Sequence, residues 1–106
     1  IRAADRRPMR VRLPHQLDRA EVRRRLDERK GEIVTYFPEG MATLESGWQG
    51  EDHLDFTVAV AGQRIGGAID IGDDHVEIEI DLPFILSFLR PTIERSMRKE
   101  GTRLLT

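Results

Sequence analysis

The sequence predicts an α+β domain in which an antiparallel β-meander packs with two helices, in the order β-α-β-β-β-β-α. Five segments alternate apolar and polar residues, which is the pattern of strands with one buried face. Two other segments repeat apolar residues at helical spacing. Short turns rich in glycine and aspartate separate the last strands and favour hairpins between them. With 106 residues, the chain has room for one hydrophobic core.

The first strand and the first helix follow each other near the N-terminus. Residues 9–13 alternate Met, Val and Leu with two arginines, which predicts a half-buried strand. A helix is expected over residues 18–37, with Asp18 as its N-cap and Glu21 in the capping-box position. Gly31 lowers helix propensity, so we expect the second half of this helix to fray or bend.

Four strands are expected in the central part of the chain. Residues 42–48 alternate imperfectly, whereas residues 54–60 and 76–82 alternate cleanly. Residues 65–71 place three isoleucines on one face, with Gly67 where a fourth side chain should be. Gly62 lies between two of these strands and supplies the positive φ that a tight hairpin needs.

The C-terminal helix is expected to be kinked or restarted at Pro91. Pro83 opens a helical segment, and proline is tolerated in a first helical turn but not in a helix interior. Gly101 is expected to end this helix.

Charge divides the chain into an acidic centre and basic flanks. Residues 39–82 hold eleven acidic side chains against one arginine. We expect residues 1–7 to form a flexible basic arm and residues 8–106 to form a single α+β domain. No apolar run approaches the roughly 20 residues that span a bilayer, and there is no cysteine for a disulfide. A cytoplasmic location is therefore expected.

The histidines do not predict a metal site. His53 and His75 each follow two acidic residues, but such residues are common at turns for backbone reasons. The three histidines lack the spacing that places two imidazoles on one helix face. We expect neither a metal nor a cofactor.

The sequence also predicts no catalytic residue. None of the serines, Ser46, Ser87 and Ser96, lies in the glycine pattern of a nucleophile elbow. The acids of the last strand are expected to face water, whereas general acid–base catalysis uses desolvated carboxyl groups. We therefore expect a protein that is not an enzyme.

Nucleic-acid binding is not favoured either. Three consecutive arginines, at positions 23–25, could contact phosphates, but acidic residues of the same helix neutralise them. The open face of the sheet is expected to be acidic and to lack the aromatic residues on which bases stack.

The segment 84–89 is apolar on more than one face. Such a segment is either buried against the sheet or meets another surface. We therefore define a candidate interaction surface from this segment and from the outer-face charges of the first and last strands, which lie opposite each other if these strands are neighbours. Its residues are Phe84, Ile85, Phe88, Glu77, Glu79, Asp81, Arg10 and Arg12.

Three stretches in order carry a resemblance to a known family: residues 15–23, the central meander, and Leu82–Leu86 running into Pro91–Glu94. Together they resemble the polyhydroxyalkanoic acid system proteins, small bacterial proteins found with storage-polyester genes. The resemblance covers nearly the whole chain from about Arg10 to Glu100. It departs from the family at Arg90-Pro91, where a glycine-containing break is expected, and in the longer arginine-rich N-terminus.

The resemblance implies a non-enzymatic accessory protein of polyhydroxyalkanoate granules, acting through protein or granule-surface contacts, and it supplies no catalytic residue. Two alternatives stay open. One is a small-molecule-binding protein or enzyme with a cavity between sheet and helices, for which Gly66 and Gly67 would leave room. The other is a homo-oligomer held by the acidic centre and the basic flanks.

Overall fold

The structure is a computed structural model that describes residues 8–36, 42–60 and 62–106. The basic arm expected at residues 1–7 lies outside the described residues. The elements are β1 (Met9–Pro14), α1 (Arg19–Arg29), the 3₁₀ helix η2 (Lys30–Tyr36), β2 (Thr43–Trp48), β3 (His53–Val60), β4 (Gln63–Ile71), β5 (His75–Asp81), the 3₁₀ helix η3 (Phe84–Leu89) and α2 (Arg90–Leu105). The predicted order of strands and helices is confirmed.

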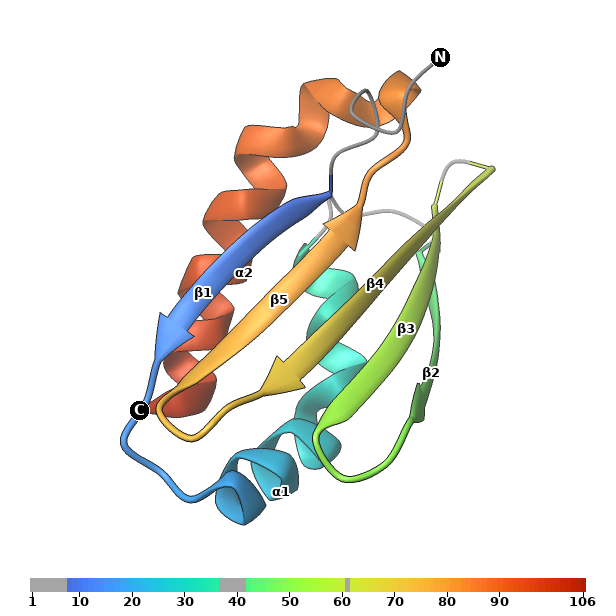
Figure 1. Cartoon of the computed structure of the whole chain (residues 1–106). Helices are drawn as coiled ribbons and strands as arrows, with labels where there is room; N and C mark the ends of the chain where they lie inside the picture. The colour runs from blue at the N-terminus through green and yellow to red at the C-terminus, as the bar shows by residue number, and fades with distance from the viewer. Residues whose placement is uncertain (1–7, 37–41, 61) are drawn as a thin grey trace.

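The five strands form one antiparallel sheet in the order β1-β5-β4-β3-β2 (Figure 1). Strands β2 to β5 make the meander, and β1 adds to its edge beside β5. In this register Arg10 lies opposite Glu79, and Arg12 lies opposite Glu77. The expectation that these arginines and glutamates face each other across neighbouring strands is thereby confirmed.

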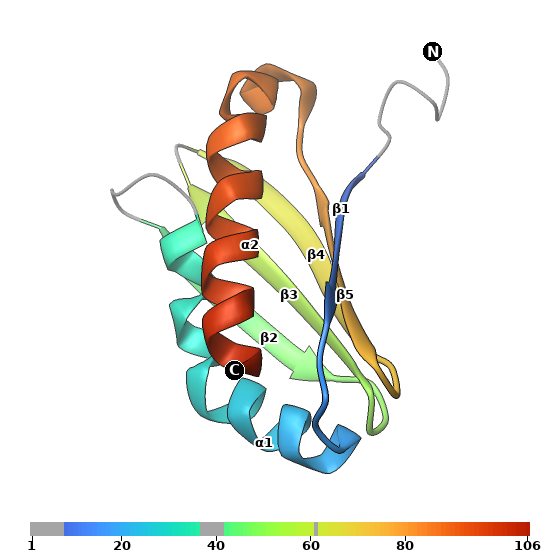
Figure 2. The ribbon, with the colours of Figure 1, turned by 90° about the vertical axis from the view of Figure 1, so that its left-hand side faces the viewer.

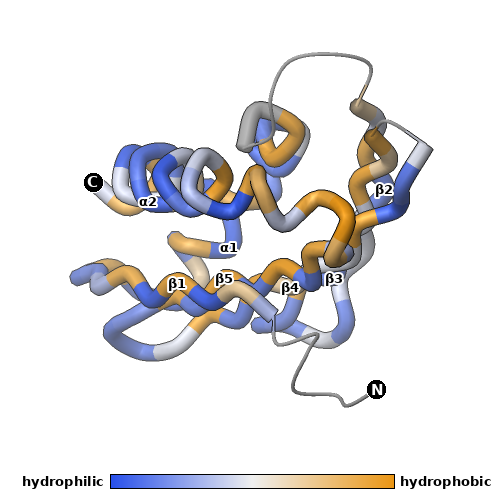
Figure 3. The backbone as a smooth tube through the Cα atoms, turned by 90° about the horizontal axis from the view of Figure 1, so that it is seen from above, coloured by the Kyte–Doolittle hydropathy of each residue, from blue (hydrophilic) through white to orange (hydrophobic). Residues whose placement is uncertain are grey.

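Both helices lie on the same face of the sheet (Figure 2). Seen from above, the apolar side of the sheet faces them, and the opposite side is uncovered (Figure 3). The most deeply buried side chains come from both layers and include Val11, Val22, Ile65, Ile80 and Ile93. Burying an aliphatic side chain of this size contributes about 1.5–3 kcal/mol, so the sandwich of sheet and helices holds the fold together.

Helix α1 begins after Asp18, as predicted, but the capping box is wrong. The Asp18 side chain makes no cap hydrogen bond. Glu21 instead accepts charged hydrogen bonds from Arg24 at 2.7 Å and from Arg25 at 2.8 Å. Hydrogen bonds between ionised groups are roughly twice as strong as neutral ones, and this explains why Glu21 turns towards the arginines.

The second half of this helical region differs from the first, as expected from Gly31. After Arg29 the chain tightens into η2, a 3₁₀ helix that begins at Lys30. Ile33 nevertheless stays buried, with 2% of its surface exposed. The change of helix type therefore keeps this segment packed on the core.

The restart of the C-terminal helix is confirmed, but its predicted end is wrong. Helix α2 begins at Arg90, and Pro91 lies in its first turn, where its missing N–H costs no hydrogen bond. The helix continues past Gly101 to Leu105, which is buried. A side chain at Gly101 would clash with Leu13 of β1, so this glycine allows close helix–strand packing.

Gly67 also serves packing. It lies opposite Phe56 in the register of β3 and β4, and the Phe56 ring fills the space that a side chain at Gly67 would need. The expectation that Gly67 leaves room for a ligand is therefore wrong. The neighbouring Gly66 differs, because a Cβ atom there would meet nothing within 4 Å.

These two glycines give a matched pair of substitutions. Gly67→Ala would place its Cβ atom against the Phe56 ring and 2.8 Å from the carbonyl oxygen of Glu79. We expect it to lower the free energy of unfolding by about 1–3 kcal/mol, as overpacking does. The control Gly66→Ala is expected to stay within about 0.5 kcal/mol. Urea unfolding measures both, and equal midpoints for the two variants would contradict the packing role of Gly67.

Candidate interaction surface

The 3₁₀ helix η3 sorts its apolar residues into separate faces. A 3₁₀ helix has three residues per turn, so residues three apart share a face. Leu86 and Leu89 form the inward face and pack on the core. Ile85 and Phe88 share a second face and are 66% and 74% exposed. Phe84 begins the third face and is 83% exposed.

This geometry settles the choice between burial and exposure for the segment 84–89. Two leucines anchor η3, and we call the other three apolar residues, Phe84, Ile85 and Phe88, the apolar turn. An α-helical stripe would have buried more of the segment, but the three-residue period leaves the apolar turn in water. The apolar turn continues directly from β5 at one end of the sheet (Figure 1).

The predicted charges of the candidate surface lie together on the uncovered face of the sheet. Arg10 forms an ion pair with Glu79 at 3.6 Å. Arg12, however, directs its guanidinium to Nε2 of His75 at 3.1 Å and not to Glu77. Asp81 is exposed and has no ion-pair partner among the residues that the structure describes. The face therefore carries charges of both signs, and Asp81 lies beside Phe84 of the apolar turn.

A shallow hollow joins the sheet face to the apolar turn. Its volume is about 220 Å³. It is lined by Arg64, Gly66, Asp81, Leu82, Pro83 and Phe84. Sequence analysis expected Gly66 to leave room for a ligand between the sheet and the helices, but it missed Arg64 and this hollow on the uncovered face. The strand register carries the signal, since Gly66 lies opposite Asp81 on the uncovered face.

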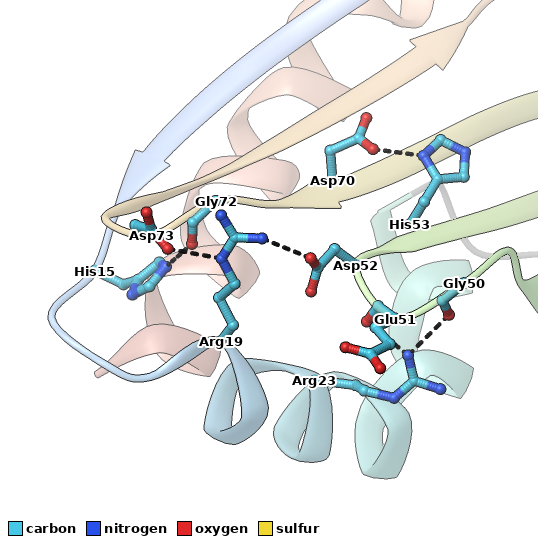
Figure 4. A network of polar contacts seen from close by, with 10 residues as sticks. All are labelled: His15, Arg19, Arg23, Gly50, Glu51, Asp52, His53, Asp70, Gly72 and Asp73. Atoms are coloured by element: carbon cyan, nitrogen blue, oxygen red, sulfur yellow. Dashed lines mark hydrogen bonds and ion pairs between the residues drawn. The ribbon is translucent and has the colours of Figure 1, made fainter.

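The opposite end of the molecule carries a polar network that ties three loops together (Figure 4). Arg19 of α1 donates to Asp52 at 2.6 Å and to Asp73 at 2.7 Å. His15 is buried and its Nε2 lies 3.0 Å from the carbonyl oxygen of Gly72. These groups bond to each other, so the network holds the loops after β1, β2 and β4 in place.

The three consecutive arginines of α1 are engaged in contacts within the chain. Arg23 stacks over the Trp48 ring at 4.0 Å and donates to the carbonyl oxygens of Gly50 and Glu51. Arg24 and Arg25 both bond Glu21. Their geometry is that of a packed helix surface and leaves few donors for phosphates.

His53 lies between two carboxylates on the uncovered face. Its Nδ1 is 2.5 Å from Asp70 and its Nε2 is 2.8 Å from Asp55. The hydrogen bond to Asp70, followed by that to Asp55, raises the pKa of His53 above its usual 6.5. Within the described part of the chain, no group of three or more His, Cys, Asp or Glu side chains is arranged so that it could hold a metal ion.

The comparisons with known proteins decide the family. The family model described as "Putative polyhydroxyalkanoic acid system protein" matches residues 9–105. The chain belongs to this family. The match includes every described helix and strand, so the predicted resemblance is confirmed. A comparison with curated proteins found no match.

One solved structure shares the fold of this family member. It is the crystal structure of TTHA0849 from Thermus thermophilus, with a TM-score of 0.55 and 16% identity. The match covers 92% of this chain and 91% of that chain. At this identity the likeness shows the arrangement of sheet and helices alone.

Within the described residues, no helix is long and apolar enough to cross a membrane.

The raised pKa of His53 predicts a pH dependence with a definite sign. Its contribution to the free energy of unfolding is fully present below the unfolded pKa, near 6.5, and is lost as pH rises through the folded pKa. Exposed pairs of this kind contribute about 0.2–1 kcal/mol. In His53→Gln this pH-dependent part of the stability should vanish.

Titration of the His53 ring, followed by NMR, tests the cause directly. We expect a midpoint above 6.5 in the unaltered chain. Asp70→Asn should lower this midpoint more than Asp55→Asn, because the bond to Asp70 is the main cause of the raised pKa. A midpoint that neither substitution moves would contradict the assignment.

Proposed function

We propose that this chain is a non-enzymatic accessory protein of bacterial polyhydroxyalkanoate storage, which attaches through the apolar turn to the granule surface or to a protein on it. One observation carries the proposal. Three large apolar side chains of η3 are exposed to solvent, although Leu86 and Leu89 already anchor this segment to the core. Family membership supplies the storage context.

The apolar turn has the properties of a contact surface. Contiguous exposed apolar residues on a protein surface mark interaction sites. Covering a phenylalanine or isoleucine side chain contributes about 1.5–3 kcal/mol, so these three side chains supply the main favourable term against the cost of association. The apolar turn lies at one end of the molecule (Figure 1), where it can meet a surface without obstruction from the sheet.

The uncovered sheet face supplies a polar surround for this contact. Arg10 and Glu79 are paired in the free chain, whereas Asp81 has no ion-pair partner in the described part of the chain. Interfaces combine a hydrophobic centre with a polar rim. We infer that the charged face orients the attached protein, and that this part of the contact weakens with salt.

Two further features support an accessory role without catalysis or phosphate binding. The acids of β5 lie on the uncovered face, whereas general acid–base catalysis uses a desolvated site. The three consecutive arginines of α1, at positions 23–25, are engaged within the chain, which disfavours phosphate binding. Neither a cofactor nor a nucleic acid is needed for a contact made by apolar side chains.

Phe88→Asp tests the proposal, because Phe88 is 74% exposed and contributes little to folding. A charge at the centre of the apolar turn should weaken binding to isolated granules at least tenfold, while the unfolding midpoint stays unchanged. Co-sedimentation with granules measures binding. The control Thr102→Asp puts the same charge on an exposed residue of α2, about 18 Å along the helix axis from Arg90.

Protein-free polyester particles separate the two targets. Binding to bare particles that Phe88→Asp abolishes shows contact with the polymer surface, and binding only to coated granules shows contact with a granule protein. Two results would contradict the proposal: an unaltered chain that binds neither bare particles nor granules, or an equal loss of binding in Phe88→Asp and in the control Thr102→Asp. Self-association of the unaltered chain in sedimentation, lost in Phe88→Asp, would assign the apolar turn to a homo-oligomer instead.

A further inference from the structure

The hollow beside the apolar turn is open because of one glycine. Gly66 of β4 lies opposite Asp81 of β5, and a Cβ atom at Gly66 would meet nothing within 4 Å. The floor of the hollow at this point is therefore bare backbone. Phe84 stands at the other side of the hollow and is also part of the apolar turn.

Two polar side chains of the hollow keep hydrogen-bonding capacity. Arg64 makes one long contact, 3.4 Å from Glu45, and its side chain is 69% exposed. A guanidinium has five N–H donors, so most of them stay available. The Asp81 side chain has no hydrogen-bond partner among the described residues, and its carboxylate can accept from a ligand.

This set of groups is complementary to the class of ligand that the proposed function supplies. An aliphatic hydroxyester chain alternates short alkyl segments with ester carbonyl oxygens, and one of its ends is a hydroxyl. Phe84 and Pro83 offer apolar contact to the alkyl part, and Arg64 offers donors to an ester carbonyl. Asp81 offers an acceptor for the terminal hydroxyl. A few polar groups placed within an apolar lining fix the orientation of a ligand.

We propose that the hollow between Gly66 and Phe84 binds the hydroxyl-terminated end of an aliphatic hydroxyester chain; the choice of ligand class rests on the proposed function. The volume of about 220 Å³ lies below the roughly 300–1,000 Å³ of drug-sized sites. The hollow therefore takes only one or two short hydroxyacyl units. We expect the dissociation constant for a free oligomer to lie in the millimolar range.

Phe84 connects this site to the granule contact. Because Phe84 belongs to both the hollow and the apolar turn, attachment through the apolar turn brings the hollow to the polymer surface. The effective concentration of chain ends is high there, so weak binding to each end is sufficient.

The test uses the whole chain labelled with ¹⁵N and the methyl ester of a linear 3-hydroxybutanoic acid trimer with a free hydroxyl end. We expect saturable shifts of the backbone amides of Gly66, Leu82 and Phe84. Gly66→Phe fills the hollow and should weaken binding at least tenfold. The control Ala68→Phe adds the same ring two residues further along the same face of β4, and binding should persist.

A second variant keeps the test decisive if Gly66→Phe lowers stability. Asp81→Ala removes the acceptor from an exposed position, so it should abolish the preference for the hydroxyl-ended trimer over the same trimer with an acetylated end. No saturable shift in the unaltered chain, or unchanged binding in Gly66→Phe, would overturn the proposal.

Granule co-sedimentation distinguishes this proposal from the proposed function. Gly66→Phe leaves Ile85 and Phe88 in place, so it should still bind granules. A chain that binds granules through Phe88 but does not bind the trimer would overturn the hydroxyester site alone. A chain that binds the trimer but not granules would overturn the granule attachment alone.

Discussion

The packing of α2 across the apolar face of the sheet is the contact on which the rest of the structure depends. An antiparallel sheet with one apolar face must be covered by another layer. Helix α2 supplies four buried residues spaced four apart, and at one of them, Gly101, a Cβ atom would overlap the position of the Leu13 side chain, which would have to shift. This contact holds β1 at the edge of the meander. The buried residues of α2 are Ile93, Met97, Gly101 and Leu105.

The position of α2 also determines what the preceding segment can do. Because α2 begins only at Arg90, η3 has to connect the end of β5 to the start of the helix. A 3₁₀ connection turns only every third residue inward, so Leu86 and Leu89 suffice to anchor it. The core has no place for the other apolar side chains of η3. Folding alone thus accounts for the leucines and leaves the apolar turn without a structural reason.

Much of the fold could be predicted because period-two alternation is a direct consequence of a sheet with one covered face. The misses depend on side-chain neighbours and on helix type, which the alternation within one segment does not specify. Glu21 is a good capping residue until nearby arginines compete for it, and Gly101 ends a helix only if no strand needs the space beside it. The exposure of Phe88 depends on whether η3 has three or 3.6 residues per turn, which composition does not specify. Predicting the hollow would have required knowing that Gly66 pairs with Asp81, which depends on the register of the two strands.

The two ends of the molecule differ in how completely their polar groups are satisfied, and this difference supports the proposed attachment at the end that carries η3. At the loop end Arg19 bonds two carboxylates at 2.6 and 2.7 Å, and buried His15 bonds a backbone carbonyl. Such groups have little left to offer a partner, and they fix the loops. At the end that carries η3, Asp81 has no ion-pair partner among the described residues, and Phe84 is 83% exposed beside it. Unsatisfied polar groups next to exposed apolar ones gain most from contact with a surface that offers both. The physical chemistry of the free chain therefore favours binding at the η3 end, with the loop end acting as its rigid support.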